Sequence, residues 1–223
     1  MAQLYLVRHG QASFGAADYD KLSDIGHKQS KLLGQYFAQR DIVFDSIVTG
    51  DMRRHKETAA GIQDGANSAL PVITDAGWNE FDFNAVVGAY LNRNPTMRPP
   101  DDAPRAEFYR LLRNAMFAWS RQEIGNELPE SWEGFTGRVS EAVQRICSSD
   151  NKNVLVASSG GAIAITMMNM LELSVEKAVN FNLQIKNTSI NHFFFNREGI
   201  QLSSFNNIGH LDLPEHKSLI TYS

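Results

Sequence analysis

The 223-residue sequence contains a single cysteine and no long uninterrupted apolar run. Cys147 has no partner for an intramolecular disulfide, which fits a reducing compartment. The longest apolar-looking run, residues 160–171, is too short to span a bilayer and contains Thr166 and Asn169. Arg8 interrupts the amino-terminal apolar stretch too early for a signal peptide. We expect a soluble, cytoplasmic protein with no membrane partner.

The sequence also lacks an excess of positive charge. Its formal net charge is -4 at pH 7, whereas nucleic-acid-binding surfaces are basic, so we expect no nucleic-acid partner. Hydrophobic residues at 43% and charged residues at 21% are ordinary proportions for a globular protein, and this length suffices for one well-packed core. We therefore expect one domain over residues 1–223.

Short apolar runs alternate with segments of helical periodicity along the chain. The runs that predict strands are residues 4–7, 44–48, 71–74, 153–158, 188–195 and 200–205, with a hairpin turn at 196–199. Helices are expected after Ser23, after Thr49 or Asp51, after Ser131 and from Ser159 through Leu171, because these residues precede apolar positions at helical spacing. This order predicts an α/β protein, a three-layer α/β/α sandwich with a mostly parallel sheet.

One segment does not fit this alternation. Residues 84–104 contain four prolines and several turn residues, which predicts an irregular insertion. The next segment, residues 105–123, carries an apolar stripe at helical spacing and is expected to form a helical cover. Arg93 and Arg98 lie in the insertion, which we expect to border the mouth of the ligand pocket.

The first predicted strand ends in Arg8, His9 and Gly10. Open α/β sheets bind ligands at the carboxyl ends of their strands, so these side chains are candidates for a site. The arginine fork suits phosphate oxygens, and an imidazole can act as nucleophile, base or metal ligand. On this stretch alone, a surface Arg-His pair at a strand end is an equally good interpretation.

Two arginines, Arg53 and Arg54, fall in the first turn of the second predicted helix. Cations there oppose the helix dipole, so we expect them to face an anion. A solvated basic patch is the alternative interpretation.

Glu80 and Asp82 lie among aromatic residues, where partial desolvation raises a carboxyl pKa and suits a general acid. Pairing of Glu80 with an arginine is the alternative. Ser159, Gly160 and Gly161 form a glycine-rich turn at a helix start, which points backbone N–H groups toward an anion.

The ordered set of motifs resembles one family. Leu-Val-Arg-His-Gly at residues 6–10 resembles the signature of the histidine phosphatase superfamily, which has the phosphoglycerate mutase-like fold. Further matching segments follow in the family's order: residues 22–29, Arg54 with Thr58-Ala59, Asn79-Glu80, Glu130-Ser131 and residues 187–211. The resemblance covers essentially the whole chain.

The resemblance implies phosphomonoester hydrolysis through a phosphohistidine on His9, with Glu80 protonating the leaving oxygen and then activating water. It implies no metal and no other cofactor, as in a histidine acid phosphatase-type enzyme. The expected ligand is a small phosphorylated metabolite or phosphate itself. The expected phosphate-binding residues are Arg8, Gln11, Arg54, Ser159 and Gly160.

The sequence departs from the family pattern at several positions. Ser159 stands where the family normally has a second histidine, Gly50 where a serine is usual, and Asn84 where a glycine commonly follows the acid. The residues that grip phosphoglycerate in the mutase branch are not evident in residues 11–20, so a glycolytic mutase is not expected.

Three functions remain to be compared. The favoured one is a phosphatase, slowed by Ser159. The second is a weak or silent relative that binds phosphorylated ligands, because Ser159 replaces the second histidine. A serine hydrolase is disfavoured, because Ser158 and Ser159 lack the Gly-x-Ser-x-Gly turn. The sequence leaves open the substrate and whether the protein forms a homodimer.

Overall fold

The computed structural model describes residues 1–13, 20–100, 102–125 and 127–222, and these contain a six-stranded sheet in the order β3-β2-β4-β1-β5-β6. The strands are β1 (Ala2–Arg8), β2 (Ser46–Thr49), β3 (Val72–Thr74), β4 (Asn153–Ser158), β5 (Ile190–Asn196) and β6 (Gly199–Asn207). The first four are parallel to one another, whereas β5 is antiparallel to β1 and β6 is antiparallel to β5. The parallel strands therefore end at one common edge.

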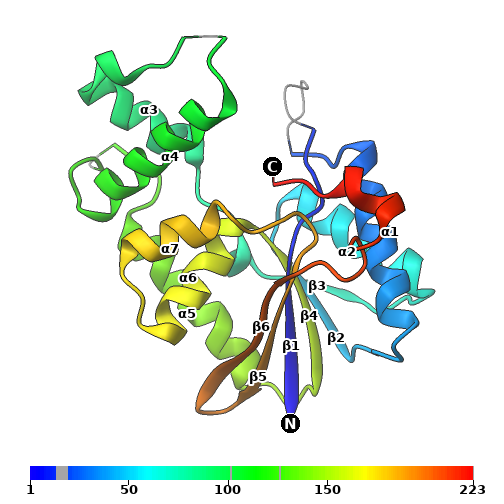
Figure 1. Cartoon of the computed structure of the whole chain (residues 1–223). Helices are drawn as coiled ribbons and strands as arrows, with labels where there is room; N and C mark the ends of the chain where they lie inside the picture. The colour runs from blue at the N-terminus through cyan, green and yellow to red at the C-terminus, as the bar shows by residue number, and fades with distance from the viewer. Residues whose placement is uncertain (14–19, 101, 126, 223) are drawn as a thin grey trace.

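Helices cover both faces of the sheet, so the predicted three-layer sandwich is confirmed (Figure 1). They are α1 (Asp24–Ala38), α2 (Arg53–Ala66), α3 (Phe83–Arg93), α4 (Arg105–Ser120), α5 (Trp132–Cys147), α6 (Gly160–Leu171) and α7 (Val175–Asn182). Short 3-10 helices cover Ala76–Trp78, Pro95–Met97 and Pro214–Leu219. Helices α1 and α2 lie on one side, and α5, α6 and α7 on the other. Helices α3 and α4 stand beyond the carboxyl ends of the strands, where α4 packs on α7.

Two helices begin at the serines that the sequence indicates. The hydroxyl of Ser23 accepts a hydrogen bond from the N–H of Gly26 at 3.1 Å, and the hydroxyl of Ser131 accepts one from Gly134 at 3.0 Å. Each bond satisfies a backbone donor that the helix itself leaves without a partner.

The start of α2 differs from the prediction. Its N-cap residue is Met52, which makes no side-chain capping bond, so neither Thr49 nor Asp51 is the cap. Thr49 is the last residue of β2, and the N–H of Asp51 donates to the side-chain oxygen of Asn79 at 2.6 Å. The chain is therefore held away from helical geometry until Arg53.

The predicted irregular insertion at 84–104 is wrong for its first half, because α3 occupies Phe83–Arg93. The carboxylate of Asp82 caps this helix by accepting from the N–H of Ala85 at 2.9 Å. The prolines begin only at Pro95, after the helix has ended. The Arg93 guanidinium donates to the backbone carbonyl of Glu123 beyond α4. The helical cover expected at 105–123 is present as α4.

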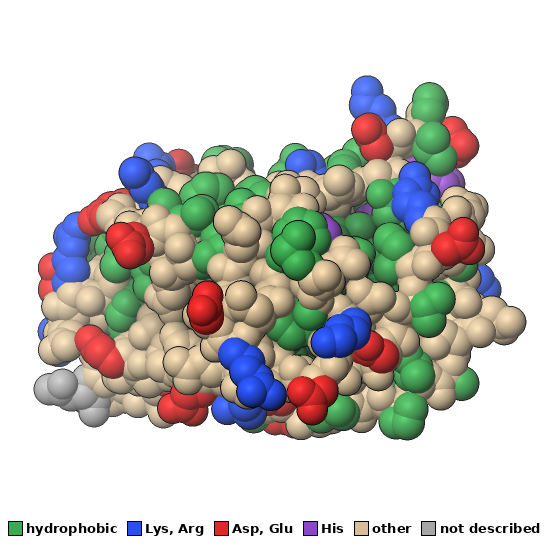
Figure 2. Space-filling view, turned by 90° about the horizontal axis from the view of Figure 1, so that it is seen from below, with side chains coloured by type: hydrophobic (Ala, Val, Ile, Leu, Met, Phe, Trp, Pro, Cys, Tyr) green, Lys and Arg blue, Asp and Glu red, His purple; other side chains and the backbone are tan. Residues whose placement is uncertain are grey.

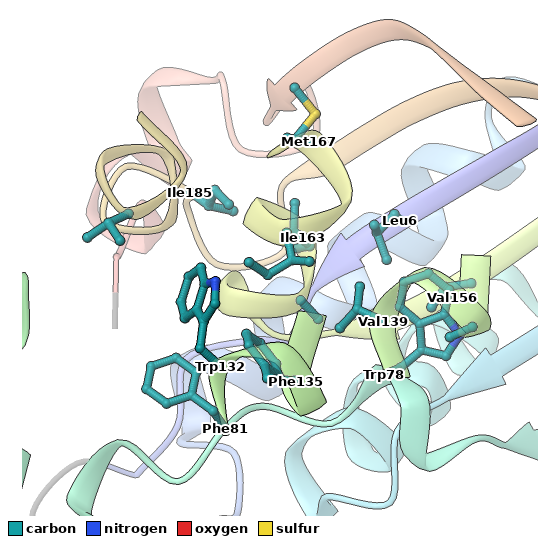
Figure 3. Close-up of a cluster of buried hydrophobic side chains, with 14 of the residues drawn as sticks. Leu6, Trp78, Phe81, Trp132, Phe135, Val139, Val156, Ile163, Met167 and Ile185 are labelled. Atoms are coloured by element: carbon teal, nitrogen blue, oxygen red, sulfur yellow. The ribbon is translucent and has the colours of Figure 1, made fainter. Parts of the chain in front are cut away.

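The larger buried cluster lies between the sheet and the helices α5 and α6, and it includes the aromatic residues that flank Glu80 (Figure 3). The ring of Phe81 lies 5.1 Å from that of Trp119 and 5.4 Å from that of Phe135, measured between centroids. Burial of one such side chain contributes about 1.5–3 kcal/mol to stability. The backbone on either side of Glu80 is thereby fixed to the core, since Trp78 is also fully buried.

The face of the molecule in Figure 2 is not dominated by charge of one sign, because acidic and basic side chains are interspersed over it. In the part of the chain that the structure describes, none of the helices has the length and apolarity needed to cross a membrane.

Candidate active site

The candidate site lies where β1 and β4 end. These strands run parallel with Arg8 paired to Ser158, and the N–H of His9 donates to the carbonyl oxygen of Ser158 at 2.8 Å. His9 and Ser159 are the next residues of the two strands, so the pairing places them side by side. The position that the sequence predicts for His9, the carboxyl edge of the sheet, is the one observed.

His9 is buried, with 5% of its surface exposed. Its Nδ1 lies 2.7 Å from the carbonyl oxygen of Gly10. A carbonyl oxygen can only accept, so in the neutral ring Nδ1 carries the hydrogen and Nε2 carries the lone pair. Burial, followed by the charges of Arg54 and Arg8, lowers the pKa of His9 well below its ordinary value. The site therefore contains a neutral imidazole whose lone pair is on a defined nitrogen, Nε2.

The backbone around His9 is anchored from two further elements. The side-chain amide of Asn187 donates to the His9 carbonyl oxygen at 3.0 Å, and the Gly10 N–H donates to the hydroxyl of Thr58 at 3.0 Å. Thr58 in turn donates to the carbonyl oxygen of Arg54 at 2.6 Å. The segments that the family resemblance picks out at Thr58 and Asn187 thus hold the backbone on which the imidazole is carried.

Arg54 is buried in the first turn of α2, and its Nη1 contacts the carboxylate of Asp20 at 2.6 Å. The other carboxylate oxygen of Asp20 accepts from the backbone N–H of Arg53 at 2.8 Å. The anion expected at this helix start is therefore supplied, in part, by the protein itself. Sequence reasoning missed Asp20, because nothing in a polar loop marks which acid will reach a helix more than thirty residues later.

Arg8 is partly buried, and its guanidinium donates to the carbonyl oxygens of Ile185 and Tyr222, the latter at 2.8 Å. The charges of Arg8 and Arg54 both act on the pKa of His9 and on that of Glu80. The positive charges of both guanidinium groups are thus felt by both candidate catalytic side chains, as those of a phosphoryl clamp would be.

Glu80 is partly buried beside the start of α6. One carboxylate oxygen accepts from the Gly161 N–H at 2.9 Å, and the other accepts from the Phe81 N–H at 3.2 Å. Burial raises its pKa despite these two donors and the nearby arginines. Asp82 is exposed and caps α3, so Glu80 is the acid that faces the site.

The remaining predicted residues have other neighbours. The Gln11 side-chain oxygen accepts from the Ser23 hydroxyl at 2.8 Å, which ties it to the cap of α1. A Cβ at Gly160 would lie 2.4 Å from the side-chain oxygen of Asn182, so glycine permits the close approach of α7. The Gly161 N–H, expected to face an anion, is directed to the carboxylate of Glu80.

The structure brings one further histidine into the site. His55 is fully buried, and its ring centroid lies 5.8 Å from that of His9. Its Nε2 lies 2.7 Å from the hydroxyl oxygen of Ser159. The sequence analysis passed over His55, although the departures at Gly50 and Ser159 were signals that this part of the site is rearranged.

Among the residues that the structure describes, no three or more histidine, cysteine, aspartate or glutamate side chains are grouped so that they could hold a metal ion.

Comparison with known proteins agrees with this geometry. A putative phosphoserine phosphatase 2 of Hydrogenobacter thermophilus is 25% identical over 222 residues, which cover 94% of this chain and 98% of that protein. A solved mutant phosphoserine phosphatase of Entamoeba histolytica, in complex with phosphoserine, has a TM-score of 0.65 at 22% identity and covers 95% of this chain and 100% of that one. A phosphoglycerate mutase of Bacillus anthracis has a TM-score of 0.63 at 21% identity, with 94% of each chain covered.

The two solved structures show the shared fold, which is that of the phosphoglycerate mutases. The family itself is shown by a model of the histidine phosphatase superfamily (branch 1), which matches residues 4–208. The protein, with its strand-end His9 and flanking arginines, belongs to branch 1 of the histidine phosphatase superfamily.

Proposed function

We propose that the protein hydrolyses phosphomonoesters of small molecules through a phosphohistidine on His9. The observation that carries the proposal is the orientation of the His9 ring, in which the Gly10 carbonyl holds Nδ1–H and leaves Nε2 as the attacking atom. The membership of the family and the phosphatase names of the relatives support the reaction class.

In the first step, the Nε2 lone pair of His9 attacks phosphorus as the bond from phosphorus to the leaving oxygen breaks. The Glu80 carboxyl gives its proton to that oxygen, so the alcohol departs neutral. In the second step, Glu80 takes a proton from water, the water oxygen attacks phosphorus and the phosphorus–nitrogen bond breaks. Phosphate leaves, and both side chains return to their starting states.

The charges in the site suit both steps. Arg8 and Arg54 disfavour the cationic form of His9, which keeps the nucleophile neutral. The same cations stabilise negative charge on the transferring phosphoryl group, where positioning and electrostatics supply most of the catalysis. We propose that no metal takes part, so a chelator should leave turnover unchanged.

The test is hydrolysis of p-nitrophenyl phosphate in the presence of EDTA, with the intermediate trapped by alkaline quench because phosphohistidine is labile to acid. Mass spectrometry should locate the phosphoryl group on His9, and His9→Ala should abolish turnover and labelling. The matched control is His192→Ala, since His192 is a partly buried histidine on β5 that contacts Gln3. A phosphoryl group on serine, or full turnover by His9→Ala, would refute the mechanism.

Ser159 favours one alternative, a protein that binds phosphorylated ligands with little or no turnover. Calorimetry with inorganic phosphate separates the two functions when combined with the assay above. Binding of phosphate without turnover of any phosphomonoester would establish the alternative.

A further inference from the structure

We propose that His55 is a positioning residue, which aims the hydroxyl hydrogen of Ser159 at the phosphoryl group that His9 receives. The inference rests on the proposed phosphatase function and adds a residue that the family resemblance does not indicate. It also explains how the chain can operate with a serine at position 159.

The contact between these residues joins two segments that are distant in sequence. His55 belongs to the first turn of α2, and Ser159 precedes α6, yet Nε2 and Oγ are 2.7 Å apart and both side chains are fully buried. Ser159 also adjoins His9 through the pairing of β1 with β4. The hydroxyl therefore lies beside the His55 ring, on the residue that follows the backbone partner of His9.

The hydroxyl of Ser159 is not used to cap its own helix. The serines that precede α1, α5 and α7 each accept a hydrogen bond from the first turn of their helix, whereas Ser159 makes no such bond. Its oxygen has His55 as the partner instead. Because buried polar groups are normally hydrogen-bonded, a buried serine that does not cap its helix is expected to use its hydroxyl in another contact.

The hydrogen on His55 can be placed by counting donors. Burial and the charge of Arg54 lower the pKa of His55 well below its ordinary value, so the ring is neutral and carries one hydrogen. Nδ1 is buried and has no hydrogen-bond partner among the described residues. An orphaned buried N–H is rarer than an under-satisfied acceptor, which favours the hydrogen on Nε2.

With its hydrogen on Nε2, His55 donates to the oxygen of Ser159. The serine hydroxyl then has an accepting oxygen that is occupied and a hydrogen that can be donated elsewhere. Donors that share a chain of hydrogen bonds polarise one another, so this hydroxyl becomes a stronger donor than an isolated serine. A phosphoryl oxygen on the adjacent His9 is the acceptor that the proposed reaction supplies.

Gly50 provides the space that the His55 ring occupies. A Cβ at this position would lie 2.4 Å from Nδ1 of His55 and 2.6 Å from the side-chain oxygen of Asn79. Any side chain there would displace a buried ring. The departures from the family pattern at positions 50 and 159 thus meet at one imidazole.

The test compares His55→Ala, Ser159→Ala and the double variant in the hydrolysis of p-nitrophenyl phosphate, with inorganic phosphate as a competitive inhibitor. Loss of one such donor lowers kcat by on the order of 10²–10³. We expect the kcat of each single variant to decrease by a factor up to that size. The inhibition constant for phosphate should change by less than about threefold, because the arginines hold the anion. The double variant should lose no more than about twofold beyond the worse single variant, since both act through one hydroxyl.

His55→Gln separates positioning from packing, because its amide N–H₂ can reach the Ser159 hydroxyl. It should recover part of the kcat that His55→Ala loses, and His192→Ala should behave as wild type. Wild-type kcat in His55→Ala, or losses that multiply in the double variant, would overturn the inference. Turnover by the wild type would still support the proposed function in either case.

A measurement on the resting protein is independent of turnover. The ¹⁵N chemical shifts of the His55 ring should show hydrogen on Nε2, and Ser159→Ala should shift the Nε2 signal while leaving that of His192 unchanged. Hydrogen on Nδ1 of His55 in the wild type would overturn the inference even if the enzyme is active. If the wild type lacks all turnover, the proposed function fails, and with it this role for His55, whatever the tautomer.

Discussion

The carboxylate of Glu80 accepts a hydrogen bond from the backbone N–H of Gly161 at 2.9 Å, so the candidate acid is fastened to the first turn of α6. A Cβ on Gly161 would lie 2.0 Å from the other carboxylate oxygen, which shows how closely the two residues approach. The backbone of the same loop is held by Arg138, whose guanidinium donates to the Asn79 carbonyl at 2.8 Å and pairs with Glu130 at 2.6 Å. Glu80 is therefore rigidly placed, as a proton donor must be.

Glu80→Gln should distinguish substrates by their leaving groups. The amide cannot protonate the departing oxygen, so kcat/KM for an alkyl phosphate should fall by about 10²–10⁴. Nitrophenolate departs without protonation, so kcat/KM for p-nitrophenyl phosphate should fall much less. Steady-state kinetics on both substrates, with Asp82→Asn as control, give the comparison. Equal losses on the two substrates would remove Glu80 from the acid role, and a larger loss for Asp82→Asn would transfer it.

The pH dependence of kcat/KM for an alkyl phosphate should be bell-shaped with its maximum on the acid side. In the proposed reaction His9 acts in its neutral form, and because its pKa is lowered, the acid limb lies well below the usual range of histidine. Glu80 acts in its protonated form in that reaction, and because its pKa is raised, activity falls on the alkaline side only above the usual carboxyl range. Glu80→Gln should abolish the alkaline limb. An alkaline limb that persists in this variant would assign that limb to another group.

Much of the fold follows from local patterns. The bounds of β4 agree with the sequence prediction to the residue, and α6 ends at the predicted Leu171 but begins at Gly160, one residue after the predicted start, because an apolar run and a pair of glycines mark these elements clearly. Helix α7 was missed, since it has only eight residues and buries only Ala178 and Val179. The bounds of an element were thus predictable where a long apolar run or stripe marked it, and not where the element was short and mostly exposed.

The candidate site was predictable to the extent that its residues follow strands. His9 and Ser159 follow β1 and β4, which meet because parallel strands share one carboxyl edge. His55 and Asp20 could not be found in this way. Each acts through a contact with a residue far away in sequence, and that contact depends on how α2 packs beside β4 and the first loop.

Protein stability should fall with acidification, and His210 should account for part of the loss. Its Nε2 contacts the hydroxyl of Thr188 at 2.8 Å, and burial lowers its pKa from 6.5 to about 3. Below pH 6.5 His210 therefore binds a proton in the unfolded chain, whereas in the folded protein it binds one only below about pH 3.

Between pH 7.5 and 5 this difference amounts to about 2 kcal/mol of unfolding free energy. Urea unfolding of His210→Gln should show a smaller loss over that interval by about that amount. An unchanged pH dependence in His210→Gln would show that His210 is already protonated in the folded protein.

Gly50→Ala should lower turnover while keeping every side chain of the site. The added methyl group would overlap Nδ1 of His55, so the ring must move away from Ser159. We expect kcat for p-nitrophenyl phosphate to fall at least about tenfold, with phosphate inhibition little changed. Gly137→Ala in α5 is the matched control, because a Cβ there meets nothing within 4 Å. A Gly50→Ala enzyme with wild-type kcat would show that the position of the ring is unimportant.

Restoring a histidine at position 159 should succeed only when His55 is also removed. From the sequence alone, Ser159→His is expected to raise turnover if the pocket has room for the ring, and otherwise not to fit. In the structure, however, the space beside Ser159 is filled by the buried ring of His55, whose Nε2 lies 2.7 Å from the hydroxyl oxygen. A second imidazole there would overlap the first, and such overpacking typically costs about 1–3 kcal/mol of stability.

Ser159→His alone should therefore lower the urea midpoint and leave kcat at or below the wild-type value. The combination of His55→Ala with Ser159→His transfers the imidazole across the contact, so its kcat should exceed that of His55→Ala alone by at least about tenfold. Urea unfolding and p-nitrophenyl phosphate kinetics on the three variants decide the matter, because only steric exclusion makes His55→Ala rescue Ser159→His. If Ser159→His alone is stable and faster than wild type, the two rings fit together, and the space at position 159 is larger than the contact with His55 indicates.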